Sequence, residues 1–180
     1  MNSDTHDPVL LHFSRQGAHI PWQSIGDPVM GGQSSGTLES VDDVTSVFHG
    51  EVSLANGGGF ASVKADIPVV DFSSCCGLRL RVRGDGKNYK LGLRMHQDRN
   101  APVYQQGFAP DAGQWQTIVL PFAGFIPRLR GKTLTDAPPM DASHIASVSL
   151  FISGGQQGAF ALHLTDAVRV NRCTAATESS

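Results

Sequence analysis

The sequence predicts an all-β protein, a jelly-roll sandwich of two antiparallel sheets with little helix. Apolar and polar residues alternate along many short segments, as in strands with one buried face. No segment keeps the 3.6-residue period of an amphipathic helix for three turns. The 20 glycines and 10 prolines punctuate these segments, which is typical of a fold with many turns.

The clearest alternation lies in residues 77–83 and 89–95. In the first segment, Arg79, Arg81 and Arg83 alternate with leucines and a valine, so the arginines must share one polar face. In the second segment, Lys90 and Arg94 take the polar positions. The glycine-rich residues 84–88 lie between the two segments, and this spacing predicts a β-hairpin. A hairpin would place all five cations on one patch.

Further strands are expected along the rest of the chain. Alternating positions in residues 48–54, 61–65, 115–120, 146–152 and 160–170 each predict a strand with an apolar face. On this pattern Tyr89 and Trp115 are expected to face the core.

Length and charge limit the function classes. The 180 residues fit one β-sandwich domain, expected at residues 9–172, with flexible tails at 1–8 and 173–180. A formal net charge of -2 gives no overall attraction to nucleic acid. No apolar run approaches the roughly 20 residues of a membrane span.

The three cysteines indicate a reducing compartment. Their number is odd, Cys75 and Cys76 are adjacent, and no Cys-x-x-Cys spacing for zinc is present. Reduced thiols are therefore expected. The polar first residues lack a signal-peptide pattern, so a cytoplasmic protein is expected.

Residues 22–36 form the densest motif in the chain. They read Trp22, then Asp27, then Met30-Gly31-Gly32, and end at Gly36. This motif resembles the opening of the complex I intermediate-associated protein 30 family. Later blocks resemble the same family in the same order, over roughly residues 11–170. The motif residues to which we assign a structural role are Trp22, Met30, Gly31, Gly32, Gly36, Gly59, Phe60, Gly84, Asp85, Gly86 and Trp115.

The resemblance implies a galactose-binding-like jelly roll, which agrees with the alternation. It also implies a role in the assembly of respiratory NADH–ubiquinone oxidoreductase, with subunits of that complex as protein partners. Fold alone does not determine function, so the partner surface must be argued from residues.

The glycine-rich part of the motif does not predict a phosphate site. A Walker loop needs a lysine and a following helix, and neither is present after Gly36. A tight turn with close backbone approach is expected instead. Asp27 has two interpretations: a carboxylate that accepts backbone N–H groups in a turn, or a contact to a ligand, partner or calcium ion.

No catalytic, metal or cofactor constellation is predicted. The seven histidines show no i, i+2 or i, i+4 pair that would suggest a metal site. No serine stands in a nucleophile-elbow context, and no carboxylate pair suggests glycoside cleavage. We therefore expect a non-enzymatic binding protein without a cofactor.

Two binding functions remain. The first is a protein-binding, chaperone-like assembly factor, in which the expected binding residues are Arg79, Arg81, Arg83, Lys90, Arg94 and Asp27. The second is a module for carbohydrate or another small ligand, which would require exposed aromatic side chains. Aromatic residues make up only 7% of the chain, so the first function is favoured.

Overall fold

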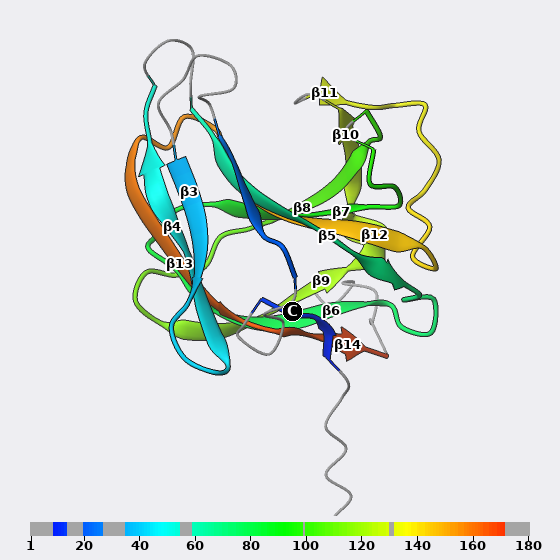
Figure 1. Cartoon of the computed structure of the whole chain (residues 1–180), viewed down its shortest axis with the longest axis horizontal. Coiled ribbons are helices and arrows are strands. Elements are labelled where there is room, and N and C mark those ends of the chain that lie inside the picture. The colour runs from blue at the N-terminus through cyan, green and yellow to red at the C-terminus, as the bar shows by residue number, and fades with distance from the viewer. Residues whose placement is uncertain are drawn as a thin grey trace, which may run out of the picture.

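The chain folds into a sandwich of two antiparallel sheets, each with seven strands (Figure 1). The computed structural model describes residues 9–13, 20–26, 35–54, 59–98, 100–129 and 132–171. The only helix in these residues is a 3-10 turn at Phe122–Gly124. The predicted galactose-binding-like jelly roll is confirmed.

The first sheet has the strand order β1-β14-β6-β13-β4-β3, and β9 pairs with the free side of β6. Its strands are β1 (Val9–Leu11), β3 (Ser35–Ser40), β4 (Thr45–Val52), β6 (Gly77–Arg83), β9 (Trp115–Pro121), β13 (Gly158–Thr165) and β14 (Ala167–Val170).

The second sheet has the order β11-β10-β8-β7-β12-β5-β2. Its strands are β2 (Gln23–Gly26), β5 (Ala61–Val70), β7 (Tyr89–Arg94), β8 (Val103–Phe108), β10 (Ile126–Leu129), β11 (Lys132–Thr133) and β12 (Ile145–Ile152). In Figure 1, β10 and β11 rise at one edge of this sheet.

The core lies between the inner faces of the two sheets. Leu80 of β6 and Leu91 of β7 are both buried there, as the alternation predicted. The same holds for the apolar positions of β5, β12 and β13. Burial of this apolar surface is the main driving force for folding. It also fixes which side chains face outward.

The predicted hairpin is wrong. β6 lies in the first sheet, where it pairs with β9, β13 and β14, whereas β7 lies in the second sheet between β8 and β12. The connection at 84–88 therefore crosses from one sheet to the other. The apolar faces of β6 and β7 meet across the core, an arrangement that produces the same alternation as a hairpin.

Asp85 holds this crossing in place. One carboxylate oxygen accepts hydrogen bonds from the Tyr89 hydroxyl at 2.8 Å and from the backbone N–H of Lys87 at 3.1 Å. The other accepts the backbone N–H of Ala161 on β13 at 2.9 Å. The neighbouring Gly86 has φ +87°, a conformation that favours glycine. The motif predicted at 84–86 is therefore structural, but as a crossing between sheets.

Candidate functional site

Two outward surfaces carry the charged side chains that the sequence singled out. The first is the arginine face, defined as the outward side chains of Arg79, Arg81 and Arg83 on β6 with Trp115, Thr117 and Val119 on β9. In the strand register these residues lie opposite each other in pairs: Arg79 with Val119, Arg81 with Thr117 and Arg83 with Trp115.

Trp115 organises the arginine face. The guanidinium carbons of Arg81 and Arg83 lie 5.9 Å and 5.4 Å from the centre of its ring. Cation–π attraction at these distances restrains both arginine side chains. Trp115 is 37% exposed, so the expectation that it faces the core is wrong, whereas that for Tyr89 is correct. Trp115 belongs to the outward set of β9, which alternates with the inward Leu120.

Arg81 and Arg83 have no acidic neighbour in ion-pair contact among the described residues. His163 on β13 packs its ring edge-on to Trp115, with 6.5 Å between ring centres. Burial lowers the pKa of His163, and the charge of Arg83 lowers it further. The face thus combines restrained cations with an exposed aromatic ring.

Lys90 and Arg94 do not join this face. They lie on β7 and point outward from the second sheet, on the opposite side of the sandwich. The predicted five-cation patch is therefore wrong, because it depended on the hairpin. The structure brings together three of its five members.

The second surface is the serine face, defined as the outward side chains of β5, β7, β8 and β12. The strand register arranges them in three rows across the sheet. The rows run Arg94, Ser147, Asp66; then Gln105, Gly92, Ser149, Lys64; then Gly107, Lys90, Phe151, Ser62. Gly92 and Ser149 lie in the middle row, where a Cβ at Gly92 would lie 2.7 Å from the Phe151 ring and 2.8 Å from Val103.

Several of these outward side chains are recessed. Ser147 is 0% exposed, Ser149 2% and Lys64 9%, although none of them belongs to the apolar core. The Lys64 ammonium lies 3.5 Å from the Asp66 carboxylate. Over the ranges that the structure describes, the Ser147 hydroxyl and Nε of Arg94 are buried and have no hydrogen-bond partner. The same face also carries the accessible polar side chains of Lys90, Gln105 and Asp66, which make it a candidate binding surface.

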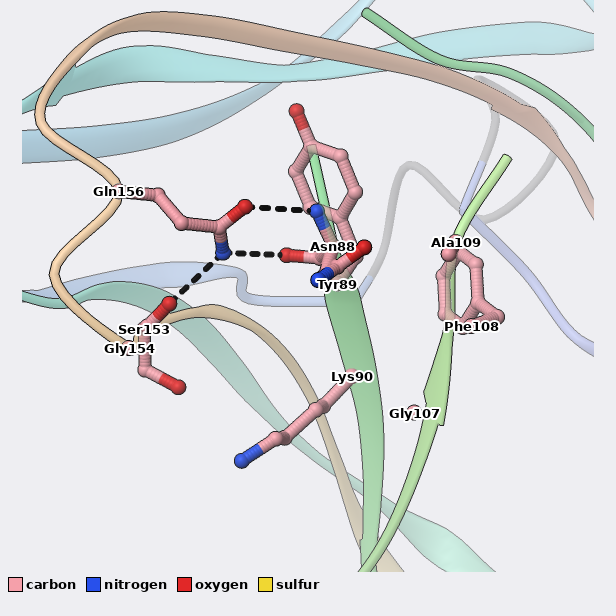
Figure 2. Close-up of a pocket in the computed structure, with 9 residues that line it drawn as sticks. All are labelled: Asn88, Tyr89, Lys90, Gly107, Phe108, Ala109, Ser153, Gly154 and Gln156. Atoms are coloured by element: carbon pink, nitrogen blue, oxygen red, sulfur yellow. Dashed lines mark hydrogen bonds between the residues drawn. The ribbon is translucent and has the colours of Figure 1, made fainter. Parts of the chain in front are cut away.

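A pocket of about 510 Å³ opens at one end of the serine face. It lies between the start of β7, the end of β8 and the β12–β13 connection, as Figure 2 shows. Its lining includes Asn88, Lys90, Gly107, Ala109, Ser153 and Gln156. Burial lowers the pKa of Lys90, and the nearby charge of Arg128 lowers it further.

The remaining motif residues have structural surroundings or lie outside the described residues. Trp22 stacks on Phe13 with 5.4 Å between ring centres. Gly36 is buried, and a Cβ there would lie 3.0 Å from the Phe48 ring. Gly59 has φ +141°, and Phe60 beside it is half-buried. Asp27, Met30, Gly31 and Gly32 lie outside the described residues, so their predicted roles stay predictions.

The sequence prediction did not single out the serine face. The signal was nonetheless present: Ser62, Lys64 and Asp66 alternate with apolar residues, as do Ser147 and Ser149. Polar side chains at alternate positions of two strands indicate that these strands share a polar outward face.

The thiols differ from expectation. Cys75 is a free thiol, whereas Cys76 is disulfide-bonded. The expectation of reduced cysteines is therefore wrong for Cys76. Since disulfides persist mainly in oxidising compartments, the thiols no longer support a cytoplasmic location.

Among the described residues, no group of three histidine, cysteine or acidic side chains could hold a metal ion. Over those same ranges, no helix has the length and apolarity needed to cross a membrane.

Comparison with solved structures identifies proteins that share this fold. The chain is similar to the family 11 carbohydrate-binding module of a cellulosomal cellulase from Clostridium thermocellum, with 14% identity and a TM-score of 0.69 over 97% of this chain and 99% of that module. A complex of the Clostridium thermocellum family 11 module with a β-1,3-1,4-mixed-linked tetrasaccharide matches at 15% identity and a TM-score of 0.64, covering 86% and 91% of the two chains.

An agarase structure also contains the fold. It matches at 13% identity and a TM-score of 0.61, covering 93% of this chain but 25% of the agarase. At these identities the similarity establishes the jelly-roll fold alone.

The family model for complex I intermediate-associated protein 30 matches residues 11–164. The chain therefore belongs to the complex I intermediate-associated protein 30 family. A comparison with curated protein sequences finds no match.

Proposed function

We propose that this chain is a non-catalytic binding domain that acts as a protein-binding assembly factor, with respiratory complex I subunits as its clients. The observation that carries this proposal is the pair Arg81 and Arg83 held against Trp115 on an exposed sheet face. Tryptophan and arginine are the residues most enriched at binding hot spots between proteins. Family membership supports the choice of client.

The chemistry of the arginine face favours an acidic partner surface. Guanidinium groups form planar, bidentate contacts with carboxylates. They are more weakly hydrated than ammonium groups, so they lose less hydration free energy when an interface forms. Because Trp115 already restrains Arg81 and Arg83, less side-chain entropy is lost on docking. Exposed charges are screened within about 8–10 Å at physiological ionic strength, so affinity should fall as salt rises.

Affinity purification of the tagged protein from its native host tests this proposal. We expect complex I subunits to co-purify with the parent protein and to be lost with Arg81→Glu and with Trp115→Ala. Lys90→Glu is the matched control, because it reverses a charge on the opposite sheet. Equal recovery of these subunits with Arg81→Glu, or their absence from the parent sample, would contradict the proposal.

A second candidate function is carbohydrate binding, and the serine face favours it. Outward polar side chains with accessible surface, among them Lys90, Gln105 and Asp66, can hydrogen-bond a ligand rich in hydroxyl groups. A module with the same fold has been solved with a bound tetrasaccharide. Calorimetric titration with soluble oligosaccharides tests this function, and the Arg81→Glu protein should bind them as well as the parent does.

A further inference from the structure

The pocket at the end of the serine face contains the ammonium group of Lys90. Lys90 extends from β7 toward the side of the strand where the segment from Ser153 to Gln156 lies (Figure 2). Within the residues that the structure describes, no carboxylate forms an ion pair with Lys90. We propose that this pocket binds the carboxylate of an acidic saccharide, with Lys90 as the contacting cation. This inference rests on the second candidate function, carbohydrate binding.

Lys90 is the only charged side chain among the described residues that line the pocket. Arg128 on β10 points to the same face, because it lies opposite Val103 in the register, and its charge acts on Lys90. The acidic residue in the rows of the face, Asp66, lies in the row farthest from Lys90 and beside Lys64. A bound carboxylate would relieve the repulsion between Lys90 and Arg128 and replace part of the hydration that Lys90 loses by burial.

The wall of the pocket is already fixed. The Gln156 side-chain oxygen accepts the backbone N–H of Asn88 at 2.7 Å. Its amide nitrogen donates to the carbonyls of Asn88 at 2.9 Å and Ser153 at 2.7 Å. These three bonds tie the β12–β13 connection to the start of β7. A wall that does not reorganise reduces the entropy lost when a ligand binds.

The space beside Lys90 comes from a missing side chain. Gly107 lies directly opposite Lys90 on β8. A Cβ at Gly107 would have room, with its nearest neighbours 3.7 Å and 3.9 Å away. The glycine therefore leaves space beside the aliphatic stem of Lys90 on the β8 side, and a larger residue could be accommodated there in a test.

A saccharide fits this face better than an acidic peptide does. Peptides commonly bind sheets by adding a strand at an edge, where backbone groups are free. Lys90 lies on β7, whose backbone is paired on both sides by β8 and β12. A peptide backbone would find few partners there, whereas ring hydroxyls can bond to the Asn88 and Ser153 side chains that line the pocket.

Calorimetry on the full chain tests the inference with two probes, tetragalacturonate and a neutral mixed-linked glucan tetrasaccharide. We expect tetragalacturonate to bind at least about tenfold more tightly, as a charge-assisted contact implies. Lys90→Gln should remove this preference. Gly107→Val should weaken the binding of both probes, because the valine side chain fills the pocket without changing its charge. Lys132→Gln, at an exposed position of the edge strand β11 outside the pocket lining, is the control and should leave both affinities unchanged.

The outcomes distinguish the inference of an acidic saccharide from the carbohydrate-binding function on which it rests. Equal affinity for both probes, unchanged by Lys90→Gln, would overturn the inference and leave the carbohydrate function standing. Binding of neither probe would overturn both. Tighter binding of a hexaglutamate peptide than of tetragalacturonate, lost in Lys90→Gln, would show that the proposed ligand class is wrong. Circular dichroism of each variant confirms that the fold is intact.

Discussion

The hydroxyl of Tyr89 donates a 2.8 Å hydrogen bond to the carboxylate of Asp85, four residues earlier on the chain segment that joins the two sheets. Tyr89 is 1% exposed, and its burial raises the pKa of its hydroxyl well above the ordinary range, with the Asp85 hydrogen bond raising it further. The hydroxyl therefore remains a donor at all physiological pH values. The bond links the first residue of β7 to the crossing that positions it.

Asp85→Ala should destabilise the protein by about 2 kcal/mol or more. The change leaves the Tyr89 hydroxyl and the Ala161 N–H without their acceptor, and hydrogen bonds to charged groups contribute roughly 1.5–3 kcal/mol. Tyr89→Phe removes only one of these bonds and should cost about 1 kcal/mol. Urea denaturation measures both changes. Asp111→Ala, at an exposed position, is the control, and equal stability of Asp85→Ala and this control would contradict the structural role.

Gly84→Ala and Gly86→Ala should both destabilise the protein, for different reasons. A Cβ at Gly84 would lie 2.5 Å from the Pro110 ring, so the neighbouring segment must shift. Gly86 has space around it, but its φ of +87° strains an alanine by about 1 kcal/mol. Gly107→Ala has neither problem and should melt close to the parent. Thermal denaturation of the three variants checks this order.

His163 should titrate below the ordinary histidine value near 6.5. Its pKa is lowered first by burial and then by the charges of Arg83 and His49. Arg83→Gln should therefore raise the midpoint of the His163 titration. Because the unfolded chain binds the proton more readily, the contribution of His163 to stability is present above pH 6.5 and declines as the pH falls below it. Histidine ring resonances followed by NMR give the midpoint directly, and a value above 6.5 would contradict the prediction.

Reduction should destabilise the protein through Cys76 and not through Cys75. A disulfide contributes typically 2–4 kcal/mol, mainly by restricting the unfolded chain. We expect reductant to lower the melting temperature of the parent and of Cys75→Ser, and to leave Cys76→Ser unchanged. Identical melting of the parent with and without reductant would argue against a stabilising disulfide.

The alternation predicted which side of each strand is buried but not which strands are neighbours. Leu80 and Leu91 were both assigned to the core, and both are buried. A period of two identifies the buried face of a strand. It does not distinguish a hairpin, whose strands share a sheet, from a crossing, whose strands face each other across the core. The five residues at 84–88 suit either arrangement.

The candidate site, too, could be predicted only in part from the sequence. The arginine face could be predicted because its three arginines lie on one strand. Trp115 could not be assigned to it, since it belongs to a strand that becomes the neighbour of β6 only in the folded sheet. The serine face depends on how four strands align with one another. That register cannot be read from any single segment of the sequence.

The positions of β12 and β13 have a consequence for synthesis on the ribosome. Both strands come from the last third of the chain, yet β12 lies between β7 and β5, and β13 lies between β6 and β4. A nascent chain that ends before residue 145 therefore lacks a central strand in each sheet. Its apolar faces and unpaired strand edges stay open to other chains until translation is nearly finished. Folding must wait for the C-terminal third, and truncations there should yield aggregates instead of smaller domains.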